Sequence, residues 1–110
     1  MKVSVGLPTG MEGMMYPVPF AGVHDLVDMA KRAEALGYDS VWGNDHMTTQ
    51  QYVREEFSQA PNFWEILSTY AYIAAETTSL RLGTGMLVLP MRRDIVVAAK
   101  QIATIDHLSR

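Results

Sequence analysis

The segment Asn44-Asp45-His46 contains the residue types best suited to chemistry near neutral pH. An imidazole titrates close to neutrality, so His46 could exchange a proton with a reacting molecule. Asp45 could accept hydrogen bonds from a bound molecule or hold its loop in place. In the alternative interpretation, Asp45 caps the loop backbone and His46 is an ordinary surface histidine. The residue types alone favour this alternative.

A second candidate is the run Gly83-Thr84-Gly85-Met86, which lies inside a predicted strand. Glycines inside a strand give up side-chain packing, and they usually mark a bulge or a close approach by other atoms. The hydroxyl of Thr84 could then contact a bound molecule. The alternative is that the two glycines simply let a helix come close to the sheet.

Composition argues against several other kinds of site. The sequence has 110 residues, no cysteine, three histidines and no H-E-x-x-H motif, so no metal site is expected. It also lacks the G-x-S-x-G motif of serine hydrolases. A formal net charge of -3 argues against a nucleic-acid partner, because nucleic-acid binding requires a basic surface.

The sequence also argues against a membrane partner. No apolar run approaches the roughly 20 residues that cross a bilayer. The first residues have the pattern of a strand and lack the apolar region of a signal peptide. Because cysteine is absent, a cytoplasmic location is the expected one.

Hydrophobic periodicity predicts strands that alternate with helices. Short or alternating apolar runs indicate strands, whereas apolar residues spaced three or four apart indicate helices. Gly37 is expected to end the first helix. Asn62, with Glu65 three residues later, is expected to begin the second helix, and Asp94 the third. The predicted strands cover residues 2–7, 40–43 and 80–87, and the predicted helices cover residues 24–36, 62–77 and 94–108.

This order predicts a parallel sheet, because each return to the sheet needs a helical crossover. Two α/β folds begin this way, the doubly wound sheet and the (β/α)8 barrel. The first turn after a strand, residues 8–13, lacks the G-x-G-x-x-G motif of nucleotide-binding sheets, so we favour the barrel. Active sites of barrels lie at the carboxyl ends of the strands, where His46 and the run 83–86 are expected.

Three segments resemble the luciferase-like monooxygenase family. Residues 33–42 with Asn44-Asp45-His46 resemble its second strand and the loop that follows. Residues 81–90 resemble its third strand, and residues 99–109 its third helix. Members of this family are (β/α)8 barrels that use a flavin or the deazaflavin coenzyme F420. The pair Asp45-His46 is more similar to the F420-dependent branch than to the FMN-dependent luciferases.

The resemblance implies an oxidoreductase that transfers hydride to or from a small organic substrate, or that carries out monooxygenation. Coenzyme F420 is the implied cofactor, and FMN is the second candidate. His46 would relay a proton, and Asp45 would lie near the cofactor. In F420-binding relatives the third strand carries a bulge with a non-proline cis peptide against the deazaflavin ring. That peptide would here join Gly85 and Met86, with Thr84 beside it.

Length limits this expectation, because such a barrel takes about 250 residues and this sequence supplies three of its eight units. We expect residues 1–110 to be the N-terminal portion of one barrel domain, without a second domain. The missing strands would come from the rest of the protein or from another chain. A homo-oligomer is expected, because a monomer would expose too much apolar surface. The isolated residues are expected to be inactive, and the alternative function is a non-catalytic half-barrel that serves as an accessory or assembly module.

Overall fold

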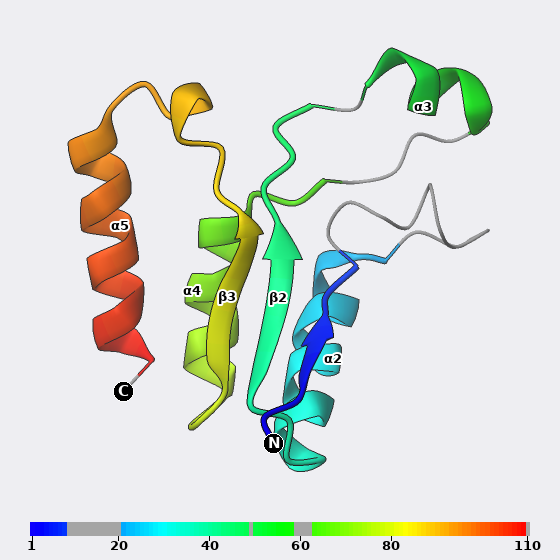
Figure 1. The fold of residues 1–110 in the computed structure, drawn as a ribbon. Coiled ribbons are helices and arrows are strands. Elements are labelled where there is room, and N and C mark those ends of the chain that lie inside the picture. Colours follow the sequence, from blue (N-terminus) through cyan, green and yellow to red (C-terminus); the bar gives the residue numbers. More distant parts are fainter. Residues whose placement is uncertain (9–20, 49, 59–62, 110) are drawn as a thin grey trace.

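A parallel three-stranded sheet forms the centre of the computed structural model, which describes residues 1–8, 21–48, 50–58 and 63–109 (Figure 1). The strands β1 (Ser4–Gly6), β2 (Ser40–Asn44) and β3 (Arg81–Met86) pair in the order β1-β2-β3. Both neighbouring pairs are parallel. The predicted α/β order is therefore confirmed, with a first strand shorter than expected.

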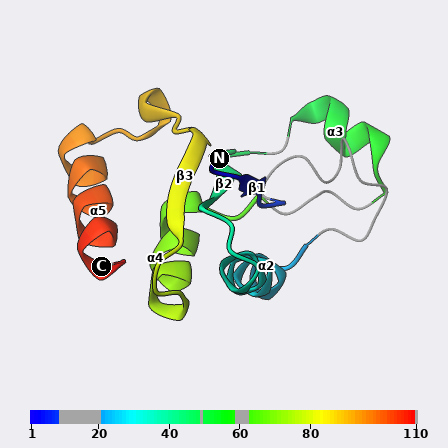
Figure 2. The same cartoon turned by 60° about the horizontal axis from the view of Figure 1, so that its bottom comes forward.

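Three longer helices follow the strands in turn. They are α2 (Val23–Ala35), α4 (Ile66–Glu76) and α5 (Ile95–Leu108). A short helix α3 (Gln51–Glu56) and a 3-10 turn η1 (Leu89–Met91) lie in the loops after β2 and β3. Figure 2 shows α2 and α4 on the same side of the sheet, and α5 next to α4 beyond β3. None of the helices in the described part of the chain is long and apolar enough to cross a membrane.

Two of the predicted helix ends are confirmed. Gly37 has a φ of 79°, a left-handed conformation that glycine adopts at low cost, and it follows the last turn of α2. The side chain of Asp94 accepts hydrogen bonds from the backbone amides of Val96 (2.9 Å) and Val97 (3.1 Å), so it caps α5. Both signals are local, and the rest of the fold does not override them.

The predicted start of the second helix was wrong. Helix α4 begins at Ile66, and Glu65 is its N-terminal cap, with hydrogen bonds from the amides of Leu67 (3.1 Å) and Ser68 (2.7 Å). Asn62 lies outside the described residues. The helix starts at Ile66 because the Glu65 side chain satisfies its first free amides, and just before it the indole of Trp64 donates to the carbonyl of Ala21.

The hydrophobic core lies between one face of the sheet and the helices α2 and α4. Each fully buried Leu, Ile or Val side chain contributes about 1.5–3 kcal/mol relative to an exposed one. The largest fully buried side chains of the core come from both helices and from β2: Leu26, Val41, Ile66 and Ile73.

The opposite face of the sheet is open among the described residues. Trp42 is 46% exposed and Met86 is 68% exposed, although parallel sheets are normally covered on both faces. Helix α5 is equally uncovered, since Ala98 is its one buried residue. Its exposed apolar side chains are Ile95, Val96, Val97, Ile102 and Leu108. This arrangement fits the first three units of a (β/α)8 barrel, in which further strands and helices would cover these surfaces.

One carboxylate joins α2 to the turn before β3. An oxygen of Glu34 accepts hydrogen bonds from the backbone amides of Thr78 (2.8 Å), Ser79 (2.6 Å) and Leu80 (3.0 Å). The amide of Ser79 contributes most to lowering the pKa of Glu34. Glu34 thus satisfies donors that the turn itself leaves without backbone partners.

We expect the substitution Glu34→Gln to lower the free energy of unfolding by about 1–2 kcal/mol at pH 7, because charged acceptors form the stronger hydrogen bonds. A lowered pKa means that the contribution is complete above the ordinary value of 4.5 and is lost as the pH falls below it. Urea unfolding at pH 7 and pH 3 should therefore show a difference between variant and wild type that shrinks in acid. The exposed Glu56→Gln in α3 serves as the control, and equal loss at both pH values would contradict this role.

Candidate active site

The carboxyl ends of β2 and β3 meet at an irregular point in the sheet. Gly43 pairs with Thr84, but the next residue, Asn44, pairs with Met86, so the pairing skips Gly85. A Cβ atom on Gly85 would lie 2.8 Å from Oδ1 of Asn44, which is too close for any residue but glycine without a shift. The bulge expected from the glycines of this strand is therefore present at Gly85.

The other glycine of this run is covered by an aromatic ring. A Cβ atom on Gly83 would lie 2.6 Å from Cε2 of Trp42, so the indole lies against the bare backbone of β3. The indole Nε1 donates to the hydroxyl of Ser40 over 3.0 Å. Gly83 therefore accommodates a side chain from the neighbouring strand, and the interpretation that it admits a helix is wrong.

Tyr70 holds β3 from the side of the helices. Its hydroxyl donates a hydrogen bond to the carbonyl of Gly83. Burial raises the pKa of Tyr70, so the hydroxyl keeps its proton and continues to donate. The strand is thus fixed on both faces immediately before the bulge.

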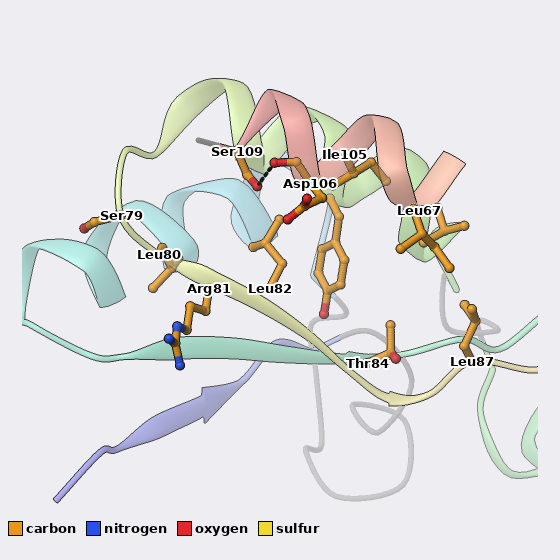
Figure 3. Close-up of a pocket in the computed structure, with 12 residues that line it drawn as sticks. Leu67, Ser79, Leu80, Arg81, Leu82, Thr84, Leu87, Ile105, Asp106 and Ser109 are labelled. Carbon is orange, nitrogen blue, oxygen red and sulfur yellow. Dashed lines mark hydrogen bonds between the residues drawn. The ribbon is translucent and has the colours of Figure 1, made fainter. Parts of the chain in front are cut away.

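Thr84 lies on the helix side of the sheet, because successive residues of a strand point to opposite faces. It lines a cavity of about 530 Å³ between β3, α4 and α5 (Figure 3). The walls of this cavity are mostly apolar and include Leu67, Leu82 and Ile105. The structure does not bring Thr84 to the same face as Trp42, and its predicted contact with a cofactor stays a prediction.

His46 is half-buried, and its ring contacts Phe63 and Gln50 within the described part of the chain. The ring stacks on Phe63 with centroids 4.7 Å apart and an interplanar angle of 28°. Its Nδ1 atom lies 3.3 Å from the amide nitrogen of Gln50, just before α3. This contact occupies Nδ1, so Nε2 is the ring nitrogen that is left for proton transfer. This orientation would let His46 donate a proton from Nε2.

Asp45 is buried in an ion pair instead of facing the solvent. Its side chain is 1% exposed and makes a two-pronged contact with Arg92, in which Nη2 donates to Oδ1 (2.7 Å) and Nε donates to Oδ2 (3.2 Å). Oδ2 also accepts from the backbone amide of Val88 over 3.0 Å. These bonds fix the loop, as one of the two sequence interpretations expected. A contact between Asp45 and a cofactor stays a prediction.

Arg92 extends this ion pair to a second carboxylate. Its Nη2 atom donates to Oε1 of Glu65 over 2.8 Å, and Glu65 also caps α4. Burial alone would raise the pKa of Glu65, but hydrogen bonds from Ser68, Arg92 and the start of α4 outweigh it and lower the pKa to about 2. We call Asp45, Glu65, Arg92 and the amide of Val88 the Arg92 cluster.

Sequence reasoning missed Arg92. Its signal was a basic residue in the loop after the third strand, at the same edge of the sheet as the acidic residue after the second. Within the described residues, no group of three or more His, Cys, Asp or Glu side chains is placed to hold a metal ion.

The lowered pKa of Glu65 predicts an acid-sensitive contribution to stability. The carboxylate contributes fully above its ordinary pKa of 4.5, and the contribution is lost as the pH falls toward the folded value of about 2. Because 39% of the side chain is exposed, solvent screening limits the effect of Glu65→Gln to about 1–2 kcal/mol at pH 7.

Urea unfolding between pH 7 and pH 2 measures this effect. Between pH 4.5 and pH 2 the stability of the variant should fall less steeply than that of the wild type, because the contribution of Glu65 is missing. The control is Glu76→Gln, which removes the exposed ion pair with Lys31 and should change stability little. A Glu65 variant that keeps the wild-type acid slope would contradict the assignment.

Comparison with known proteins gives a consistent result along the chain. The model of the luciferase-like monooxygenase family matches residues 1–110. The F420-dependent glucose-6-phosphate dehydrogenase of Amycolatopsis mediterranei is 38% identical over 88 residues, which are 80% of this chain and 25% of that protein. The enzyme of the same name from Kineococcus radiotolerans is 34% identical, over 76% of this chain and 23% of its own length.

A third relative has a different printed activity. The 5,10-methylenetetrahydromethanopterin reductase of Methanolobus tindarius is 29% identical over 84% of this chain and 24% of that protein. The chain thus spans about a quarter of the length of the curated relatives it matches. The family model covers every residue, and the parallel sheet has its glycine bulge where the resemblance placed it. The chain belongs to the luciferase-like monooxygenase family.

Proposed function

We propose that this protein is an F420-dependent oxidoreductase that transfers hydride to or from a small organic substrate. The supporting observation is the bulge at Gly85, which adjoins the Asn44-Asp45-His46 segment at the carboxyl edge of the sheet. Support also comes from two relatives that are named as F420-dependent dehydrogenases. We propose that the described residues form one wall of the site.

The residues at the bulge fit a flat ring. Gly85 presents backbone without a side chain, and the thioether of Met86 is 68% exposed beside it. Gly85 and Met86 are therefore the proposed cofactor contacts, with Asp45 and Thr84 as further predicted contacts. When bound, F420 would supply the hydride donor or acceptor, and the protein would supply orientation and proton transfer.

His46 is the proposed proton-transferring residue. Its ring is held by the stacking contact with Phe63 and by Gln50 at Nδ1, which leaves Nε2 as the ring nitrogen for proton transfer. A histidine held in this way keeps one orientation, which a general acid or base requires.

The remaining walls are proposed to come from further barrel strands, either of the same polypeptide or of another copy of it. The exposed face at Trp42 and Met86 and the uncovered α5 support this proposal. In barrels of this type the phosphate-binding loops follow strands seven and eight, so the three strands described here would not bind the cofactor tightly alone. FMN as cofactor and monooxygenation as reaction are the second candidates within the same family.

The substitution Gly85→Val tests the proposed cofactor contact. In the protein at the length its gene encodes, we expect it to raise the dissociation constant for F420 at least tenfold, because the new side chain meets Asn44 and covers the backbone. Fluorescence titration with F420 measures this constant. The matched control is Gly6→Ala in β1, where a Cβ atom would meet nothing within 4 Å.

Three results would contradict the proposal. They are F420 binding unchanged by Gly85→Val, equal loss in the Gly6→Ala control, and binding of FMN in preference to F420.

The role of His46 predicts a different pattern. We expect His46→Gln to leave the dissociation constant for F420 within threefold of wild type and to lower turnover about 10²–10⁴-fold, because proton transfer contributes in this range. Reduction of F420 with glucose 6-phosphate, the substrate in the names of two relatives, is the first assay to attempt. A His46→Gln variant with wild-type turnover would contradict this role.

The second candidate function is a non-catalytic half-barrel that docks with a complementary chain. The exposed apolar face of the sheet and of α5 favours it. Native mass spectrometry of the natural-length protein, with and without F420, distinguishes the two. A hetero-complex that binds neither F420 nor FMN would favour the half-barrel module.

A further inference from the structure

We infer that Arg92 is a positioning residue that holds in place the backbone of His46 and its stacking partner Phe63. Its effect on catalysis rests on the proposed function, whereas its effect on the orientation of His46 does not. The inference comes from the Arg92 cluster at the carboxyl edge of the sheet.

The guanidinium of Arg92 is well suited to fix directions. Its side chain is 10% exposed, and it makes three hydrogen bonds of 2.7–3.2 Å to two carboxylates. A planar guanidinium that binds a carboxylate with two parallel bonds fixes the angle as well as the distance between the partners. A lysine at this position would keep the charge but lose the two-pronged geometry.

The cluster ties together three separate segments. Asp45 belongs to the loop after β2, Val88 and Arg92 belong to the loop after β3, and Glu65 begins α4. Figure 1 shows these loops and the start of α4 at the end of the sheet toward which the strand arrows point. Among the residues that the structure describes, the backbone pairing of β2 and β3 ends at Asn44 and Met86, and the side chains of the cluster connect the loops beyond it.

The backbone of His46 and its stacking partner Phe63 are each close in sequence to a carboxylate of the Arg92 cluster. Asp45 is the residue before His46, so its buried ion pair fixes the backbone from which the imidazole extends. Phe63, which stacks on the imidazole, is two residues before Glu65. Arg92 therefore positions the backbone of His46 through the carboxylate of Asp45, and it positions Phe63 through the carboxylate of Glu65.

The carboxylates of Asp45 and Glu65 both accept a hydrogen bond from Nη2 of Arg92, and removal of Arg92 would leave them close together without a cation. Oδ1 of Asp45 and Oε1 of Glu65 lie 2.7 Å and 2.8 Å from that nitrogen. Without the cation the two charges repel each other, and a buried carboxylate without a partner is strongly unfavourable. We expect the loop after β2 and the start of α4 to move apart, which would separate His46 from Phe63.

The experiment compares Arg92→Met and Arg92→Lys with Arg93→Met, which removes the exposed neighbouring arginine. The measurement is made on the protein at the length its gene encodes, by NMR of the ring protons of His46. Stacking on Phe63 shifts these signals, and Phe63→Leu supplies the reference without stacking. We expect Arg92→Met to move the His46 signals at least halfway to the Phe63→Leu position, Arg92→Lys to move them less, and Arg93→Met to leave them unchanged.

Turnover and F420 binding form the second readout. We expect Arg92→Met to lower kcat at least tenfold while the F420 dissociation constant and KM stay within threefold, with partial recovery in Arg92→Lys. If Arg92→Met does not fold, Asp45→Asn is used in its place. This substitution weakens the same ion pair but removes one of the two charges that would repel each other. A folded Arg92 or Asp45 variant with wild-type His46 signals would overturn the inference.

Failure of the proposed function would give a different result. In that case wild-type protein would not bind F420, yet the His46 signals would still respond to Arg92 as expected. The two proposals can therefore fail separately.

Discussion

A carboxylate that is almost completely removed from water must have a cation and hydrogen-bond donors beside it, and the carboxyl edge of this structure depends on that requirement. Asp45 meets it with the guanidinium of Arg92 and the amide of Val88. An apolar pair of similar size could be equally stable, but it would not fix angles. The ion pair therefore contributes mainly geometry: the loops after β2 and β3 cannot move independently, and His46 lies on one of them.

The open face of the sheet and the exposed side of α5 have a simple physical explanation. A parallel sheet with one open face leaves large apolar side chains such as Met86 and Trp42 partly in water, and each forgoes part of the roughly 1.5–3 kcal/mol that full burial contributes. The relatives are more than three times as long as this chain. Additional strands would cover the open face, and in the proposed enzyme they would also supply the binding site for the rest of the cofactor.

Local chemistry made much of the fold predictable from the sequence. The alternation of strands and helices, the left-handed Gly37 and the Asp94 cap each depend on residues close in the chain. The start of α4 was mispredicted because Glu65 takes part in a contact with Arg92, which lies 27 residues away. Arg92 could not be found at all, since its bond to Asp45 joins positions 47 residues apart and no short motif records it. The candidate site was predictable as segments, and its internal connections were not.

The proposed cofactor is tested most directly by identifying the cofactor bound to the protein after purification from a host that makes both F420 and FMN. Its absorption spectrum and its native mass should be measured on the same sample at the length the gene encodes. We expect one F420 for each site, released on denaturation, and a decrease in F420 content when Gly85 carries a side chain. A protein that carries FMN instead, or that stays colourless after addition of F420, would contradict the central claim.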